Sequence, residues 1–165
     1  LSIPVQKVAL NTSFGQMKPD VTRAWRRHHW RTITSAYNRS PYFIYYRDEL
    51  ETYFAEAYTG TLEEWNKDLC LSVLRLISLE DKAVDSRDIE MNEDVYDFSP
   101  MFLNKGAWDK LTKLDWANYR QVFAEKYPFI PNLSILDLLF NLGPESISYL
   151  QKHCGLIDVK LGRKL

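Results

Sequence analysis

The chain contains few cysteines, glycines and histidines, the residue types that characterise disulfide-rich, glycine-rich and metal-binding proteins. Among its 165 residues there are two cysteines, six glycines and three histidines. Cys70 and Cys154 lie far apart without CxxC spacing, which predicts buried free thiols in a cytoplasmic protein and excludes a disulfide framework. No apolar run approaches the ~20 residues that a membrane-spanning helix requires, so we expect no contact with a membrane.

An excess of charge of either sign is also missing. The 21 lysines and arginines nearly balance the 22 acidic residues, and the net charge is −1. Such a balance gives no general attraction to nucleic acid or to anionic membranes. The sequence has no Walker loop, dinucleotide fingerprint, nucleophile elbow or zinc spacing, and we therefore predict neither a cofactor nor a metal site.

The length and composition that are present indicate a single domain covering residues 1–165. Hydrophobic residues make up 45% of the chain and charged residues 26%, as in ordinary globular proteins. We predict a predominantly helical α+β fold, a compact helix bundle with short terminal strands that form or join a small sheet. The strands are predicted from apolar alternation near the two ends, at Leu1, Ile3 and Val5 and at Ile157, Val159 and Leu161.

Apolar spacing and capping residues predict the helices. One helix is expected over residues 24–37, and a second after the turn, with Ser40 as its N-cap and Pro41 as its first residue. Thr61 and Glu64 form a capping-box pattern before a helix that should be central and buried and should reach about residue 79.

Later elements are predicted from weaker signals. Short helices are expected over residues 105–111 and 116–125, the second leaving Gln121 free for solvent or a ligand. Asn132 is expected to cap the next helix, and Gly143-Pro144 to separate it from the final one. Residues 80–97 carry eight acids, which predicts a solvated loop, or alternatively a lid or a carboxylate group that meets a cation.

The stretch from residue 25 to 50 is dense in arginine and polar aromatic residues. Arg27, Arg31 and Ser35 recur at four-residue spacing and so share one face of the first helix. Guanidinium groups in a row repel one another, and an anionic partner turns that cost into a gain because guanidinium pairs bidentately with phosphate or carboxylate. The alternatives are a solvated face, or ion pairs to Asp48 and Glu49 of the next helix.

That next helix should bury one stripe and present tyrosines beside it. The stripe is Phe43, Tyr46, Leu50 and Phe54. The neighbouring face, which suits a pocket wall as well as ordinary packing, holds Tyr42, Tyr45, Glu49 and Tyr53.

The late stretch FIPNLSILDLLFNLGPE, residues 129–145, predicts a helix that is apolar nearly all round. Ser134, Asp137 and Asn141 form the one polar line on it. A buried Asp137 must be paired, and an arginine or histidine of the first helix is the expected partner. The line is either a structural network or the floor of a pocket, and in the second case it shares a cavity with the arginine face.

These stretches carry a family resemblance. The order LSIPV, HHWRTITSAYNRSPYFIYYRDEL, YRQVF and FIPNLSILDLLFNLGPESISYL resembles the WbqC-like family of bacterial proteins, from residue 1 to about residue 150. Family members usually carry a further amino-terminal segment, which we expect to be absent here, and an acidic residue where this chain has Leu142. Members occur among genes for surface polysaccharide, including O-antigen clusters.

The resemblance implies a function and a set of site residues. It implies an enzyme of O-antigen and lipopolysaccharide synthesis, of the transferase type, acting on an anionic nucleotide-sugar or acyl-donor substrate. His29 would be its general acid or base, oriented by Asp137. With Arg27 from the arginine face, the substrate-binding residues would be Arg31, Ser35, Tyr37, Tyr42, Tyr46, Asn132, Ser134 and Asn141.

Other functions fit part of the same pattern. His29 could be a satisfied core histidine, and the whole protein a non-catalytic module that binds an anionic ligand or another protein. Basic and aromatic residues between Arg23 and Arg39 also fit nucleic-acid binding, but the near-neutral net charge and the acidic middle of the chain argue against it.

Overall fold

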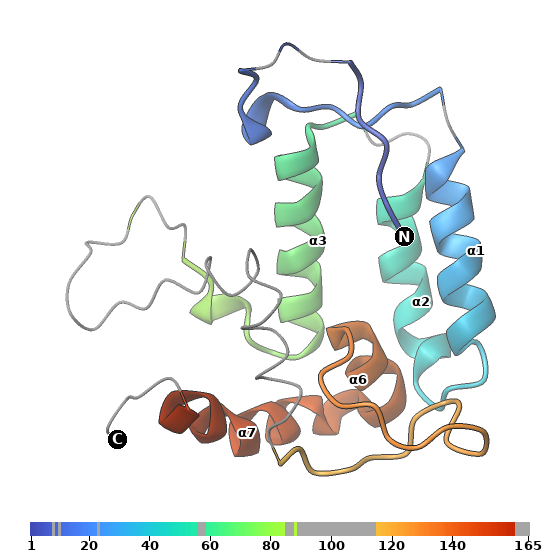
Figure 1. Cartoon of the computed structure of the whole chain (residues 1–165), viewed down its shortest axis with the longest axis vertical. Helices are drawn as coiled ribbons and strands as arrows, with labels where there is room; N and C mark the ends of the chain where they lie inside the picture. Colours follow the sequence, from blue (N-terminus) through green and yellow to red (C-terminus); the bar gives the residue numbers. More distant parts are fainter. Residues whose placement is uncertain are drawn as a thin grey trace.

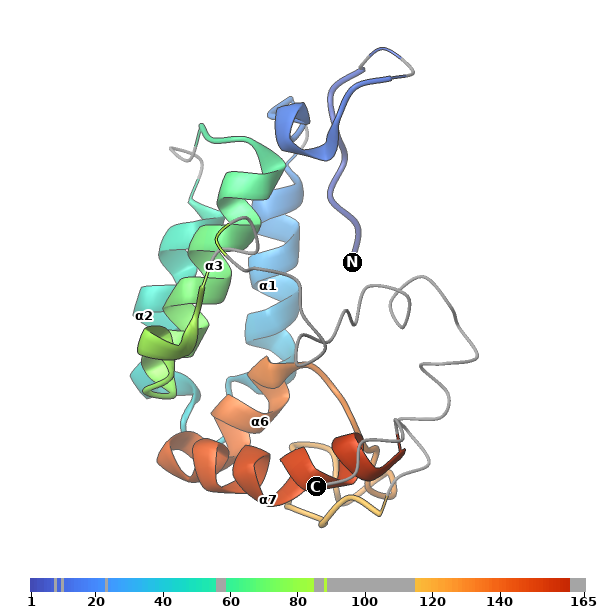
Figure 2. The same ribbon diagram turned by 90° about the vertical axis from the view of Figure 1, so that its left-hand side faces the viewer.

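In the part of the chain that the structure describes, three upright helices are closed at one end by two more. The computed structural model describes residues 1–7, 9, 11–22, 24–55, 59–84, 88 and 115–160, without the side chains of 154–160. Its α-helices are α1 (Trp25–Tyr37), α2 (Phe43–Glu51), α3 (Leu62–Leu76), α6 (Ile135–Leu142) and α7 (Ser146–Lys160). Helices α1, α2 and α3 stand side by side, α7 crosses beneath them, and α6 fills the space between (Figures 1 and 2).

Aromatic packing holds the upright helices together. Trp30 of α1 stacks on Phe43 and Phe54, with ring centroids 6.1 and 5.5 Å apart. Leu50 of α2 and Phe140 of α6 are also buried in this core. The apolar stripe predicted for the second helix is therefore confirmed. On the neighbouring face of α2, Tyr42, Glu49 and Tyr53 are half-buried and Tyr45 is exposed, as predicted.

The turn between α1 and α2 uses its residues differently from the prediction. Ser40 does not cap α2, because its hydroxyl donates to the Tyr37 carbonyl at the end of α1. Tyr42 is the N-cap of α2, and its backbone N–H donates to the Phe140 carbonyl at 3.0 Å. A contact with α6 therefore takes the place of a local side-chain cap.

Helix α3 begins with the predicted capping box. The backbone N–H of Glu64 donates to Thr61 Oγ1 at 3.2 Å, and that of Thr61 donates to Glu64 Oε2 at 2.7 Å. The helix is buried on one side only: Trp65 is in the core, whereas Cys70 is exposed. The prediction of a buried Cys70 thiol is therefore wrong.

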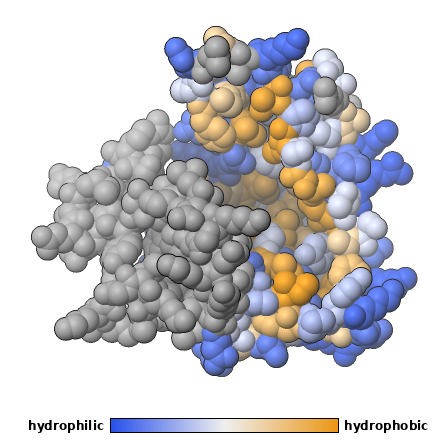
Figure 3. All heavy atoms as spheres, viewed as in Figure 1, coloured by the Kyte–Doolittle hydropathy of each residue, from blue (hydrophilic) through white to orange (hydrophobic). Residues whose placement is uncertain are grey.

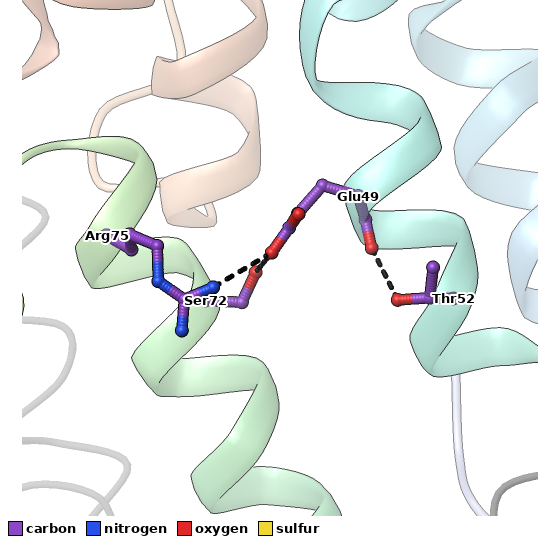
Figure 4. A network of polar contacts seen from close by, with 4 residues as sticks. All are labelled: Glu49, Thr52, Ser72 and Arg75. Atoms are coloured by element: carbon purple, nitrogen blue, oxygen red, sulfur yellow. Dashed lines mark hydrogen bonds and ion pairs between the residues drawn. The ribbon is translucent and has the colours of Figure 1, made fainter.

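Polar contacts also join α2 to α3 (Figure 4). Glu49 Oε1 accepts the hydroxyl of the fully buried Ser72 at 2.9 Å and Arg75 Nη1 at 3.3 Å. Thr52 Oγ1 donates to the Glu49 backbone carbonyl at 2.7 Å. Glu49 thus connects the two helices through its side chain while its carbonyl is satisfied locally.

The predicted terminal strands and small sheet are not formed in the part of the chain that the structure describes. Near the amino end, Val5 and Pro19 make one isolated antiparallel bridge. Pro4 lacks the N–H that would bond to the Asp20 carbonyl, so the pairing does not extend on that side of the bridge. Near the other end, residues 157 and 159 belong to α7, because the helical spacing of Ile147, Leu150 and residue 157 continues through them.

The segment after residue 114 is irregular where a helix was predicted. Residues 115–121 are extended or coiled and residues 122–127 form turns. Gln121 is buried, and its side chain accepts from and donates to the Ile130 backbone at 3.0 and 2.8 Å. Aromatic and β-branched residues are weak helix formers, so these tertiary contacts decide the local structure. The helix predicted over 105–111 and most of the acidic stretch lie outside the described residues.

Helix α6 starts later than the sequence suggests. Its N-cap is Ser134, whose hydroxyl accepts the Leu136 N–H at 3.3 Å, and Asn132 lies before it with φ +54°. The predicted break at Gly143-Pro144 is confirmed as a 3-10 turn, Gly143–Glu145.

Apolar atoms gather over α6 and in the recess above it, between α3 and α1, on the face shown in Figure 3. Among the described residues, no helix combines the length and apolarity that crossing a membrane would need.

Candidate functional site

A basic groove runs along the outer face of α1. His28, Arg31, Thr32 and Ser35 line it, and Phe123 of the 115–131 segment closes one side; its volume is about 610 Å³. The helix presents these residues together because positions three and four apart share a face. The groove thus combines a guanidinium, an imidazole and two hydroxyl groups that are exposed to solvent.

The arginines of this face have no acidic partner among the residues that the structure describes. The alternative of ion pairs to Asp48 and Glu49 is wrong, because Asp48 pairs with Arg47 at 3.1 Å and Glu49 with Arg75 at 3.3 Å. Arg27 and Arg31 are exposed. Their charges therefore remain available to an external anion.

His29 faces the interior, away from this groove. It is 6% exposed, its Nε2 donates to the Ser2 carbonyl at 3.1 Å, and its ring meets the edge of Trp25. Burial lowers the pKa of His29, and the bond to Ser2 opposes that shift. The expected contact with Asp137 is not formed. The neighbour His28 is the histidine of the groove, which its spacing from Arg31 indicates but which the prediction missed.

Asp137 lies at the centre of a separate buried cluster. Its side chain is almost fully enclosed, and Oδ2 accepts the Tyr119 hydroxyl at 2.6 Å and Gln121 Nε2 at 3.3 Å. Tyr37, the last residue of α1, lies close enough to this carboxylate for its charge to act on the phenol. The predicted partner, an arginine or histidine of the first helix, is wrong: the donors that the structure describes are the uncharged side chains of Tyr119 and Gln121.

Burial and this carboxylate act together on the phenols. The pKa values of Tyr37 and Tyr119 are raised, first by burial and then by the charge and hydrogen bonds of Asp137. Both phenols therefore stay protonated and act as hydrogen-bond donors at neutral pH. The hydrogen bonds form an internal network that joins α6 to the 115–131 segment, with the Tyr37 phenol of α1 beside it.

The remaining predicted site residues are divided between these regions and the core. Asn141 is buried and donates through Nδ2 to the Asp137 backbone carbonyl at 2.7 Å. Ser134 is exposed, so the predicted polar line on α6 is split between the surface and the interior. Tyr42 packs its ring on Gly143, and Tyr46 packs against the core.

The arginine face and the acid–amide line consequently do not meet in one cavity, contrary to expectation. What connects them is the 115–131 segment, which sends Tyr119 and Gln121 to Asp137 and Phe123 to the groove. Within the described part of the chain, no three potential metal ligands come together. A metal-free site stays a prediction.

The fold and the groove define a helical protein with an exposed cationic site on one helix. The model of the WbqC-like protein family matches residues 1–104 and 99–149, and the chain belongs to this family. It is similar to the uncharacterised protein Rv1507c of Mycobacterium tuberculosis, with 25% identity over 152 residues. That match covers 79% of this chain and 65% of the relative, so the chain spans less than two thirds of the relative's length. No solved structure matches.

Proposed function

We propose that the protein is a cytoplasmic transferase of surface-polysaccharide synthesis that holds the anionic part of a nucleotide sugar or acyl donor in the basic groove. The setting rests on the family resemblance. The observation that carries the proposal is the groove itself, in which Arg31 lies among hydroxyl side chains and no carboxylate of the described residues pairs with it. A guanidinium in this state is suited to a phosphate or carboxylate of a substrate.

The other groove residues have roles that follow from their chemistry. Ser35 can donate to a second phosphate oxygen, while the Thr32 hydroxyl already donates to the His28 carbonyl at 2.8 Å and offers only its lone pairs. The Phe123 ring provides a face on which a base or sugar can rest. For proton transfer we propose His28, because it borders the groove whereas the imidazole of His29 is buried against Ser2.

A non-catalytic module that binds an anionic ligand is the second candidate. It is favoured by the inward position of the two residues implied to be catalytic, since Asp137 is enclosed by uncharged donors and His29 by the core.

Turnover separates the two candidates. The protein is incubated with a panel of nucleotide sugars and acyl donors, and melting temperature and product mass are followed. An enzyme gives a mass change that is lost in His28→Ala, while ligand-induced stabilisation is lost in Arg31→Ala. Arg47→Ala is the matched control, because Arg47 is an exposed helical arginine outside the groove. Stabilisation without any product supports the binding module, and no response to any anion refutes both.

A further inference from the structure

A second, smaller pocket lies beside the carboxylate cluster, between the 115–121 segment, α6 and α7. Its volume is about 280 Å³. Three aromatic residues line it (Trp116, Tyr119 and Tyr149), together with Asn132 and four aliphatic residues. It shares no lining residue with the basic groove, and the residues described as lining it include no charged side chain.

The aromatic walls are fixed from behind. The Tyr149 hydroxyl donates to the Ala117 carbonyl at 2.9 Å, and the Tyr119 hydroxyl donates to the buried carboxylate of the cluster. His153 Nε2 accepts the Ala117 N–H at 2.9 Å, so its proton is on Nδ1, and its ring stacks on those of Tyr149 and Trp116. These contacts hold the pocket in shape before any ligand enters.

One polar group of the pocket lacks a partner. The Asn132 side-chain Nδ2 is buried and finds no hydrogen-bond acceptor among the described residues. Buried donors in folded proteins are nearly always paired, with protein or with a bound molecule. The backbone of Asn132, at φ +54°, is in a conformation that few residues adopt, and asparagine is among those that do.

We propose that this pocket binds an uncharged ring that carries a hydrogen-bond acceptor, the chemistry shared by a pyranose and a nucleobase. The aromatic and aliphatic walls provide apolar surface for the face of such a ring. A phosphate or carboxylate would lose its hydration here without gaining a cationic partner, which excludes a charged group. Because Asn132 Nδ2 is buried in the structure, its side chain must rotate toward the pocket to supply the donor that orients the ring. This site is independent of the proposed role of the basic groove.

Two ring compounds test the inference. The protein is titrated separately with methyl β-D-glucopyranoside and with uridine, and binding is measured by ligand-observed saturation-transfer NMR. At least one probe should bind, and Asn132→Gly should weaken that binding roughly tenfold, because one buried hydrogen bond is lost. Glycine accepts the positive φ, so the backbone is retained. Asn118→Gly is the control, since Asn118 is exposed on the 115–121 segment beside the pocket and does not line it.

The outcome shows whether the pocket binds a sugar or a nucleobase, and whether it binds a ring at all. Binding of the glycoside alone indicates a sugar, and binding of uridine alone indicates a base. If Asn132→Gly loses helical circular dichroism, Asn132→Asp takes its place, because it keeps the side-chain size and removes the donor; the same weakening is expected. Failure of both probes to bind the unaltered protein overturns the proposal, as does undiminished binding to a folded Asn132 variant.

Discussion

Gly143 fixes the junction between α6 and α7 at the scale of a single residue. Its φ of +54° lies in a region that other residues avoid. A Cβ added there would stand 2.4 Å from the Tyr42 ring, too close for any adjustment short of moving that ring. The glycine is therefore required both by the backbone and by its neighbour.

Gly143→Ala should lower the free energy of unfolding by more than about 2 kcal/mol, since backbone strain and a clash add. Gly15→Ala provides the contrast, because its Cβ would meet only the terminal Oε2 of Glu63, an exposed and flexible side chain. A loss below roughly 0.5 kcal/mol is expected there. Urea denaturation of both variants measures the difference, and equal losses would contradict this account of Gly143.

Asp137 and its phenol partners form the second residue-scale prediction. Asp137→Asn should cost about 1–3 kcal/mol of unfolding free energy, because an amide N–H₂ would face hydroxyl and amide donors. In a double-mutant cycle, Tyr119→Phe should cost less in the Asp137→Asn background than alone. Additive losses would show that the two side chains do not stabilise each other.

Which side chains meet could be predicted from the sequence only in part. The polarity of Asp137 on an apolar helix correctly predicted that its carboxylate is paired, but it did not predict that the donors are Tyr119 and Gln121 and not a basic residue of the first helix. His28 and His29 are adjacent and differ only in which side of α1 they occupy. The donors Tyr119 and Gln121 come from an irregular segment, where no periodicity indicates direction.

At the scale of elements, prediction succeeded where the signal is local. The capping box of α3 and the break after α6 depend on residues a few positions apart, and both are present. Prediction failed where contacts between residues far apart in the sequence determine the local structure. Residues 115–127 are held by Ile130 and α7, and the amino-terminal pairing does not extend past Pro4, which lacks an N–H.

The Thr61 cap gives the element-scale prediction. Thr61→Ala should lower the unfolding free energy by about 1 kcal/mol, because the Glu64 N–H loses its acceptor. Thr52→Ala is the matched control, as that hydroxyl bonds to the Glu49 carbonyl one turn earlier and serves no N–H at a helix start. In thermal unfolding, the melting temperature of Thr61→Ala should be clearly lower than that of Thr52→Ala. The reverse order would refute the capping role.

At the scale of the whole molecule, the helical bundle was predictable from composition and apolar spacing, whereas the placement of its polar faces was not. Hydrophobic patterning specifies which side of each helix is buried. It does not specify how the helices rotate about a shared core, which is why the arginine face and the Asp137 line were expected to meet and do not.

Buried phenols determine how stability changes in alkaline solution. Burial raises the pKa values of Tyr37, Tyr46, Tyr119 and Tyr149 above their ordinary value. The unfolded chain therefore loses these protons first, at pH about 10, and the folded state loses stability as the pH rises beyond that. Denaturant unfolding between pH 8 and about 11 should show this decline, with a smaller slope in Tyr119→Phe. An unchanged slope would show that Tyr119 titrates alike in both states.

The bond from the Tyr42 N–H to the Phe140 carbonyl has a consequence for the order of assembly during translation. The start of α2 is completed by an acceptor that the ribosome adds about a hundred positions later. A nascent chain that ends before α6 therefore contains α1 to α3 with an exposed core and with the Tyr42 N–H unpaired. We expect such a chain to bind chaperones until residues 135–143 have emerged from the ribosome.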